Sequence, residues 1–335
     1  MMTQLKSGTI LRDRYTITSL IGAGGMGAVY LADDQRISGR RCAVKEQLVY
    51  DKTLATQVQQ QFEQEASILA QLDHPGLPKV SDFFSNDAND RDYLVMDYVP
   101  GQNLAQLVKQ ARADNEFLDE GIVLNWVDQI CDILTYLHNC SPIVLHRDIK
   151  PANIKLMPDH RLKLVDFGLA KPFDPTDPRT VTGLQGLGSL PYTPIEQYVG
   201  HMGHTDVRSD LYALGATCYH LLTGQAPVSA HDYFLNPNSL IPPRQINTNL
   251  STHVNDIVLW AMQLHPDSRA ASIIEWHQML FQDTEMGETG LGSISLALQA
   301  TATRSSVPQI LRENGILLVV SVLLLMLALV MTFGG

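Results

Sequence analysis

The sequence has 335 residues, of which 45% are hydrophobic and 18% are charged, and its formal net charge at pH 7 is -11. This length is enough to bury a substantial core, in one large domain or two moderate ones. The acidic balance argues against nucleic acid as a partner, because phosphate-binding surfaces are basic. The four cysteines form no Cys-x-x-Cys pair and have no histidine at ligand spacing, so we expect reduced core thiols without disulfides or a zinc site.

The first predicted element is a strand that runs into a glycine-rich turn. Residues 14–21 alternate as a strand does and lead into the run 22–27, whose glycines let the backbone approach phosphate without Cβ clashes. A G-x-G-x-x-G pattern alone is weak, because dinucleotide-binding domains share it. In those domains the glycine turn opens a helix, whereas here residues 28–32 continue as a second strand. The pattern therefore predicts a β-hairpin that can cover phosphates.

Two further strands and a helix are predicted in the first hundred residues. Residues 41–45 form an apolar strand that ends at Lys45, and the apolar strand 93–99 runs into Pro100 and Gly101. Between these strands, residues 57–72 favour a helix. Its apolar face is predicted to consist of Phe62, Ala66, Leu69 and Leu72.

The most informative stretch lies near the middle of the chain. It reads His146-Arg147-Asp148-Ile149-Lys150-Pro151-Ala152-Asn153, and Asp166-Phe167-Gly168 begins thirteen residues after Asn153. Phosphoryl transfer to a hydroxyl needs a carboxylate for the hydroxyl proton, oxygen ligands for magnesium, and a cation for the transferred phosphoryl group. These roles can be filled, in that order, by Asp148, by Asn153 with Asp166, and by Lys150.

The remainder of the chain is predicted to be helical up to residue 281 and then to change character. Helices are expected at 210–222, 254–264 and 273–281, and residues 283–314 have the composition of a solvated tether.

Residues 316–333 form an uncharged run of eighteen residues, which as a helix reaches roughly 27 Å, about the thickness of a bilayer core. A buried core helix is the competing interpretation, but such helices usually carry more polar residues than Ser321 and Thr332. Arg304 and Arg312 precede the run and no Lys or Arg follows it, which places the preceding part in the cytoplasm. The N-terminus lacks the apolar run of a signal peptide. We expect a single-pass C-terminal anchor in the cell membrane, with its helix at 315–333.

Taken with their spacing, these motifs resemble the eukaryotic-like (Hanks-type) bacterial serine/threonine protein kinases, whose catalytic loop reads His-Arg-Asp and carries Asn five residues after the Asp. The resemblance covers about residues 15–282 and implies an α+β, bilobal protein-kinase fold, to which the transmembrane helix is added. Its parts would be a small β-rich N-lobe at 15–96, a hinge at 97–101 and a larger helical C-lobe at 102–282, after an N-terminal extension at 1–14.

The resemblance also implies where ATP binds. Lys45 would hold the α- and β-phosphates and pair with Glu65 of the predicted helix. Glu63 is the alternative partner, although on a helix it points about 160° away from Glu65. Met96 would line the back of the adenine pocket, and the backbone of residues 97–99 would bind the base. The full set of implied nucleotide contacts is Ile21, Gly22, Ala23, Gly24, Gly25, Met26, Gly27, Val29, Lys45, Glu65, Met96, Asp97 and Val99.

The implied catalytic residues are Asp148, Lys150 and Asn153, and the implied Mg²⁺ ligands are Asn153 and Asp166, with Mn²⁺ as a substitute metal. A lysine two residues after the catalytic Asp goes with Ser/Thr kinases in this family. His146 is expected to pack and hydrogen-bond rather than act as a base, and Asp210 is expected to hold the catalytic loop from beneath.

The activation segment would run from Asp166 to Glu196. Arg147 beside the catalytic Asp is the family mark of control by phosphorylation, since a phosphate can pair with Arg and order a loop. Thr180 and Thr182 are the candidate phosphosites, and the alternative is that they are unmodified loop residues.

Two further expectations concern the end of this segment. Ser189 would bridge the catalytic Asp and Lys through its hydroxyl. Where the family has Ala-Pro-Glu, this chain has Pro194-Ile195-Glu196, and Glu196 is expected to pair with Arg269.

Three functions fit this pattern. A membrane-anchored Ser/Thr protein kinase that uses ATP is favoured over a pseudokinase and a small-molecule kinase, because every charged group that the chemistry needs is present. The expected partners are protein substrates and the membrane, together with further copies of the chain for trans-autophosphorylation, which anchoring would promote. Nucleic acid is not expected as a partner.

Overall fold

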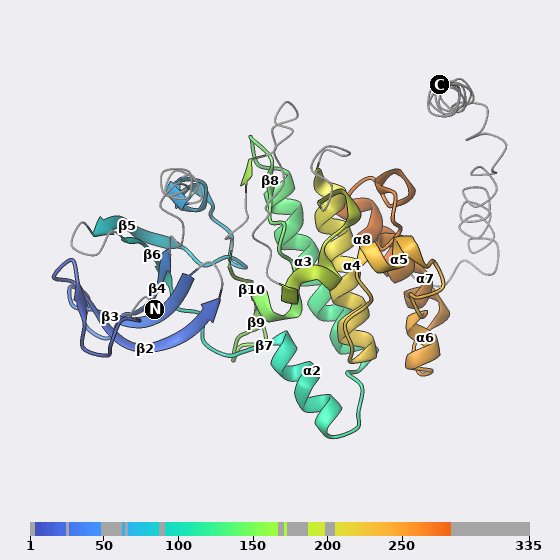
Figure 1. Ribbon diagram of the computed structural model, residues 1–335, viewed down its shortest axis with the longest axis horizontal. Helices are drawn as coiled ribbons and strands as arrows, with labels where there is room; N and C mark the ends of the chain where they lie inside the picture. The colour runs from blue at the N-terminus through green and yellow to red at the C-terminus, as the bar shows by residue number, and fades with distance from the viewer. Residues whose placement is uncertain are drawn as a thin grey trace, which may run out of the picture. The chain divides into compact units, whose positions relative to one another are not determined.

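The computed structural model describes residues 4–24, 27–47, 62–63, 66–86, 91–166, 171–172, 187–197 and 205–282. All of these except Gln282 belong to one compact unit, residues 1–281. Within this unit, a β-sheet forms the N-lobe and a larger set of helices forms the C-lobe (Figure 1). The predicted division into a small β-rich N-lobe and a larger helical C-lobe is therefore confirmed.

The N-lobe is a six-stranded antiparallel sheet with the strand order β1-β2-β3-β4-β6-β5. Its strands are β1 (Ile10–Leu11), β2 (Tyr15–Gly24), β3 (Gly27–Asp34), β4 (Arg41–Gln47), β5 (Val80–Asn86) and β6 (Arg91–Asp97). β2 and β3 pair as an antiparallel hairpin that closes at Gly24 and Gly27. A strand thus follows the glycine run, as predicted, and the dinucleotide-binding alternative is excluded.

Side-chain alternation along β4 gives the sheet two different faces. Cys42 and Val44 point into a buried cluster that includes Tyr30 and Tyr93. Lys45, one residue further, points to the other face, where its Nζ lies 6.0 Å from the ring centroid of Phe62. The sheet therefore keeps its aromatic core on one side and presents Lys45 on the other side, toward Phe62.

Phe62 belongs to the helical segment between β4 and β5, which the structure describes as helix at residues 62–63 and 66–71. Its predicted apolar face is confirmed, because the buried side chains are Phe62, Ala66, Leu69 and Leu72.

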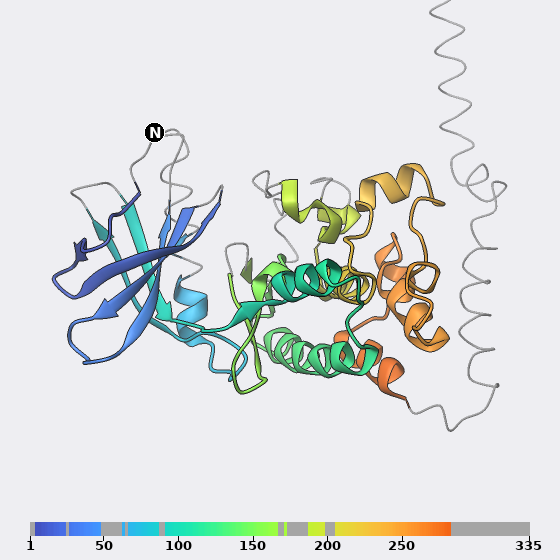
Figure 2. The ribbon, with the colours of Figure 1, turned by 90° about the horizontal axis from the view of Figure 1, so that it is seen from below.

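The C-lobe helices surround α4, and Figure 2 shows them from a second direction. They are α2 (Leu104–Ala113), α3 (Glu120–His138), α4 (Val207–Thr223), α5 (Ala230–Leu235), α6 (Pro243–Ile246), α7 (Thr252–Ala261) and α8 (Ile273–Phe281). The side chain of Asp206 caps the N-terminus of α4 by accepting from Arg208 N, and Gly224 ends the helix with φ 70°. Almost every residue of α4 between these caps is buried, so this helix is the core of the lobe.

Short strands and 3-10 turns lie in the connecting segments between β6 and α8. The strands are β7 (Gln102–Asn103), β8 (Val144–Leu145), β9 (Ile154–Leu156), β10 (Leu162–Leu164) and β11 (Lys171–Pro172). The turns are η1 (Pro151–Asn153), η2 (Leu187–Tyr192), η3 (Ile195–Gln197) and η4 (Pro266–Ser268). The predicted catalytic loop therefore runs from β8 through η1 into β9.

Within the described residues, no helix has both the length and the apolar character needed to cross a membrane. The predicted tether at 283–314 and the predicted transmembrane helix at 315–333 lie outside those residues.

All four cysteines are free thiols, as expected. Cys42, Cys131 and Cys218 are buried, whereas Cys140 is only partly buried, so it is not a core thiol.

Candidate active site

The catalytic loop is held from beneath by a fully buried carboxylate in the first turn of α4. Asp210 accepts hydrogen bonds from the backbone N–H of His146 at 2.9 Å and of Arg147 at 2.8 Å, and its Oδ2 lies 2.9 Å from Nε2 of His138. Burial raises the pKa of Asp210, but the hydrogen bond and charge of His138 outweigh burial and hold that pKa below its usual value. Asp210 therefore has the structural role that the sequence implied.

His146 is a packing residue rather than a base. Its side chain is completely buried, and its Nδ1 lies 3.3 Å from the backbone N–H of Asp148, which donates to it. Burial lowers the pKa of the imidazole, which therefore stays neutral at pH 7.

Asp148 lies at the centre of a compact hydrogen-bonded cluster. Nζ of Lys150 donates to both carboxylate oxygens, at 2.9 and 2.8 Å, and Nδ2 of Asn153 donates to Oδ2 at 2.8 Å. Oγ of Ser189 donates to Oδ1 at 3.1 Å and accepts from Lys150 at 2.7 Å. The three predicted catalytic residues thus lie together, and Ser189 bridges the Asp and the Lys as expected.

A second charged pair joins the two lobes across the site. Nζ of Lys45 lies 3.4 Å from Oδ1 of Asp166, whose side chain is half exposed. Lys45 sits in the middle of β4, paired with Val29 on β3 and with Leu94 on β6. Partial desolvation by the surrounding protein opposes ionisation of Asp166, but the charges of Lys45 and Lys150 prevail and lower its pKa. Asp166 is therefore a carboxylate at neutral pH.

These residues fit a magnesium nucleotide. Nδ2 of Asn153 donates to Asp148, which leaves the amide oxygen of Asn153 available alongside the carboxylate of Asp166. Oxygen donors of this kind are what Mg²⁺ prefers.

At the tip of the β2–β3 hairpin, Gly27 has φ 153° and a Cβ there would overlap the carbonyl oxygen of Glu46, so the hairpin needs glycine at this position.

The remaining predicted nucleotide contacts differ in how exposed they are. Ile21 and Ala23 are exposed on the hairpin, while Gly22, Val29, Met96 and Asp97 are half-buried and Val99 is buried. Outside the described residues lie the predicted contacts Gly25, Met26 and Glu65, and also the candidate phosphosites Thr180 and Thr182. Glu63, the alternative partner of Lys45, has an exposed side chain.

One residue at the site was not predicted from the sequence. Nζ of Lys155 donates to the carbonyl oxygen of Val99 in the predicted hinge, at 2.7 Å. A signal for this contact exists, because alternation along β9 puts Lys155 on the opposite face from the buried Ile154.

The end of the activation segment is tied to the C-lobe by a buried ion pair. Both terminal nitrogens of Arg269 donate to the carboxylate of Glu196, at 2.8 and 3.0 Å. Oγ of Ser209 donates to Glu196 at 2.8 Å, and the guanidinium of Arg269 lies 4.9 Å from the ring centroid of Tyr212. The predicted pair is confirmed, although the proline lies one position earlier than in the family.

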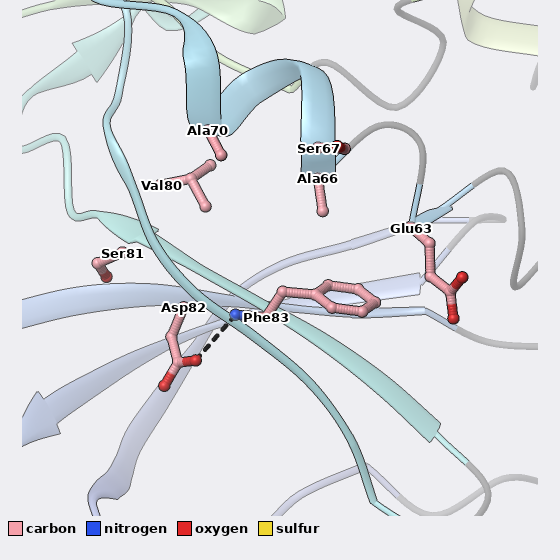
Figure 3. Close-up of a pocket in the computed structure, with 8 residues that line it drawn as sticks. All are labelled: Glu63, Ala66, Ser67, Ala70, Val80, Ser81, Asp82 and Phe83. Atoms are coloured by element: carbon pink, nitrogen blue, oxygen red, sulfur yellow. Dashed lines mark hydrogen bonds between the residues drawn. The ribbon is translucent and has the colours of Figure 1, made fainter.

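A separate open cavity of about 500 Å³ lies between the helical segment and β5 (Figure 3). It is lined by Glu63, Ala66, Ser67, Ala70, Val80, Ser81, Asp82 and Phe83. Among the described residues, none of the predicted catalytic, metal or nucleotide contacts lines it apart from Glu63, the alternative partner of Lys45, so this cavity is distinct from the cluster around Asp148.

Comparison with known sequences matches residues 15–282 to the protein kinase domain family. Serine/threonine-protein kinase B of Synechocystis is 36% identical over 228 residues, which cover 65% of this chain and 38% of that relative. A probable serine/threonine-protein kinase of Clostridium perfringens is 31% identical over 269 residues, which cover 78% of this chain and 37% of that relative.

Two solved structures share the fold. The apo form of PpkA-294 has a TM-score of 0.67 and 25% identity, and the match covers 83% of this chain and 99% of that one. The kinase domain of Mycobacterium tuberculosis PknI has a TM-score of 0.64 and 26% identity, and that match covers 83% and 98%. The chain thus matches nearly all of these two structures but spans less than two fifths of the two curated relatives.

Proposed function

This chain belongs to the protein kinase family, and we propose that it transfers the γ-phosphoryl group of ATP to serine and threonine hydroxyls of proteins. The observation that carries the proposal is the cluster in which Lys150, Asn153 and Ser189 all donate to the carboxylate of Asp148. This cluster places beside each other the carboxylate and the cation that transfer to an alcohol requires, with a hydroxyl that bridges them.

In the proposed reaction the substrate hydroxyl oxygen attacks the γ-phosphorus, the bond from that phosphorus to the bridging oxygen breaks, and ADP leaves. Asp148 orients the attacking hydroxyl and receives its proton. Lys150 stabilises the negative charge of the transferred group, and Lys45 holds the nonreacting phosphates. Asn153 and Asp166 would hold Mg²⁺, which when bound neutralises charge on the phosphate oxygens.

The choice of serine and threonine rests on Lys150. Its ammonium bridges Asp148 and Ser189 at 2.8 and 2.7 Å, so the lysine that marks Ser/Thr kinases lies beside the residue that receives the hydroxyl. The two relatives described above carry the same specificity in their names.

The test is incorporation of radiolabelled phosphate from Mg-ATP into casein by the purified full chain, followed by phosphoamino-acid analysis. Phosphoserine and phosphothreonine are the expected products. Nucleotide binding without transfer to any protein would support a pseudokinase, and transfer only to small alcohols would support a small-molecule kinase.

We further propose control by autophosphorylation at Thr180 or Thr182 in the activation segment. The support is Arg147 beside the catalytic Asp, because a new phosphate can pair with arginine and order a loop. Mass spectrometry of the full chain after incubation with Mg-ATP should find phosphate on one of these residues. Full activity in a Thr180→Ala, Thr182→Ala double variant would contradict this control.

Anchoring in the cell membrane through residues 315–333, with the kinase in the cytoplasm, is likewise a proposal. It is supported by the uncharged run and by the arginines that precede it. The full chain should float with liposomes, and a chain ending at residue 314 should not.

Anchoring would also raise the local concentration of the kinase and so promote phosphorylation between copies. The autophosphorylation rate should then be higher on liposomes than in detergent at the same total concentration. Rates that are equal in both media and indifferent to dilution would contradict phosphorylation between copies.

A further inference from the structure

A buried carboxylate lies next to Lys45 in the sequence but on the other face of the sheet. Successive side chains of a strand point to opposite faces, so Glu46 on β4 points into the aromatic core of the N-lobe. Its side chain is only 1% exposed. Burial of a carboxylate is unfavourable unless it is paired and hydrogen-bonded, and Glu46 has partners of both kinds.

Side chains from the strands on either side of β4 donate to this carboxylate. The hydroxyl of Tyr30, on β3, donates to Oε2 at 3.1 Å, and the hydroxyl of Tyr93, on β6, donates to Oε1 at 2.9 Å. Nη1 of Arg91, at the start of β6, donates to the same Oε1 at 2.6 Å. Both tyrosines are fully buried. Glu46 therefore ties β4 to both of its neighbouring strands.

The N-terminal extension reaches this cluster. The main-chain N–H of Leu5 donates to the hydroxyl of Tyr30 at 3.1 Å, and Leu5 packs against the aromatic core. Burial raises the pKa of Tyr30, so its hydroxyl keeps its proton and donates to Glu46 while it accepts from Leu5. The same segment is held on β2, where the N–H of Ile17 donates to the carbonyl oxygen of Thr9 at 2.9 Å. The extension is thus connected to the buried carboxylate.

The main chain of Glu46 lies against the glycine hairpin. In the register of β3 and β4, Ala28 lies opposite Glu46, and Val29 lies opposite Lys45. A Cβ on Gly27 would overlap the carbonyl oxygen of Glu46, so the hairpin approaches this residue as closely as glycine allows. A displacement of β4 at Glu46 would therefore move both the lysine and the contact with the hairpin.

We propose that Glu46 is a positioning residue for phosphoryl transfer, whose hydrogen-bonded side chain fixes β4 so that Lys45 and the glycine hairpin meet the triphosphate. The N-terminal extension contributes to this through Tyr30. The inference rests on the proposed function, because it takes Lys45 to hold the phosphates of ATP. Groups that are fixed in advance bind a ligand more tightly, since less ordering is required on binding.

The alternative is that Glu46 only stabilises the N-lobe, and a second tyrosine–carboxylate pair separates the two roles. Tyr15 is as fully buried as Tyr30, belongs to the same aromatic cluster, and donates to Oδ2 of Asp82 at 2.8 Å. This pair joins β2 to β5, and neither strand is a neighbour of β4. Tyr15 also lies at the opposite end of β2 from Gly24. Its loss should therefore weaken the sheet without displacing Lys45.

The test compares three variants of the full chain in detergent. Glu46→Gln removes the charge and keeps the size of the side chain, Tyr30→Phe removes one donor and keeps the ring, and Tyr15→Phe is the matched control. The readouts are the dissociation constants of fluorescent mant-ADP and, by competition, of adenosine, together with kcat, KM for casein and the melting temperature. Adenosine carries no phosphate, so its binding should not depend on Lys45.

We expect Glu46→Gln to raise the mant-ADP dissociation constant about five- to tenfold and Tyr30→Phe about threefold, because Lys45 then makes a poorer charge-assisted hydrogen bond to the phosphates. In both variants kcat should fall, whereas KM for casein and the dissociation constant of adenosine should stay within about twofold of wild type. Tyr15→Phe should lower the melting temperature about as much as Tyr30→Phe does and should bind mant-ADP as wild type does.

The inference is overturned if Glu46→Gln binds mant-ADP normally, or if it loses affinity for adenosine and mant-ADP equally, which would indicate general damage to the N-lobe. Should Glu46→Gln fail to fold, Tyr30→Phe decides by the same two criteria. Equal losses of mant-ADP affinity in Tyr30→Phe and Tyr15→Phe would also overturn it. Failure of the proposed function looks different, because the wild-type chain itself would then transfer no phosphate to casein.

Discussion

At the scale of single residues, the chemistry depends on how Asp148 is surrounded. Its two carboxylate oxygens accept from Lys150, Asn153 and Ser189, which come from two parts of the chain, the catalytic loop and η2. Of these donors, Ser189 occupies the position at which the resemblance implies a threonine. The serine lacks the methyl group of threonine but retains the hydroxyl that makes both hydrogen bonds.

Ser189→Ala should therefore lower kcat by about tenfold, because the hydroxyl that connects Lys150 and Asp148 is lost. Ser189→Thr retains that hydroxyl and should keep kcat within about threefold of wild type. Steady-state assays with casein and saturating Mg-ATP make the comparison. Equal losses in the two variants would show that the hydroxyl is not what matters.

Some of the residues at the site could be predicted from the sequence, and others could not. Asp148, Asn153 and Asp166 were found because their spacing is local and the chemistry requires those side chains. Lys155 was missed, since its partner Val99 lies 56 positions away and only the paired strands bring them together. The choice between Glu65 and Glu63 as the partner of Lys45 stays a prediction, because Glu65 lies outside the described residues.

At the scale of elements, α4 is the support on which the catalytic loop rests. Asp210 in its first turn holds that loop, and the middle of the helix packs against the end of α7. A Cβ at Gly215 would lie 2.7 Å from Cβ of Ala261 and 3.1 Å from Cγ of Met262. The glycine thus allows the two helices to approach closely.

Two effects oppose each other in Gly215→Ala. Alanine favours the helix by about 1 kcal/mol, whereas overpacking a close contact costs about 1–3 kcal/mol. Because the neighbouring Cβ is nearer than side chains normally approach, we expect a net loss of roughly 1 kcal/mol of unfolding free energy in urea titrations. A stabilised variant would mean that α4 and α7 can separate freely.

Elements were predicted well where periodicity decided them. The glycine hairpin, the apolar face of the helical segment, and α8 follow from alternation or helical spacing. Boundaries were less well predicted, because capping sets them: α4 begins at Val207, three residues before its predicted start, where Asp206 accepts from Arg208 N. β1 was not predicted, since a strand of two residues has no period of its own and exists by pairing with β2.

At the scale of the whole molecule, the buried titratable groups near the catalytic loop should make stability depend on pH. His146 faces Asp210, Asp148, Asp166 and Lys150, but burial dominates and lowers its pKa below the usual 6.5. As the pH falls, His146 therefore takes up its proton in the unfolded chain before it does so in the folded chain. Its contribution to stability is fully present above pH 6.5 and is lost as the pH falls below that value. The lowered pKa of Asp210 adds a further loss of stability only below about pH 4.

Urea unfolding at pH 7.5 and 5.5 tests this account. Wild type should lose more unfolding free energy between these values than His146→Phe, by up to about 1.4 kcal/mol for one proton. Because other histidines titrate in both proteins, the difference between the two losses is the quantity that matters. Equal losses would show that His146 titrates normally in the folded chain.

The overall architecture follows from the resemblance more than from local pattern, because the pairing of distant strands and the burial of α4 cannot be deduced from periodicity. The ion pair between Glu196 and Arg269 illustrates this, since its partners are 73 positions apart. The resemblance predicted the pair where spacing alone could not.

The central claim is that Asp148 serves phosphoryl transfer and not nucleotide binding. It is tested most directly by comparing wild type with Asp148→Asn, measuring mant-ADP binding together with phosphate transfer from Mg-ATP to casein. The account predicts that the variant binds mant-ADP within about threefold of wild type and loses at least about a hundredfold in transfer rate. A variant that transfers phosphate at the wild-type rate would contradict it.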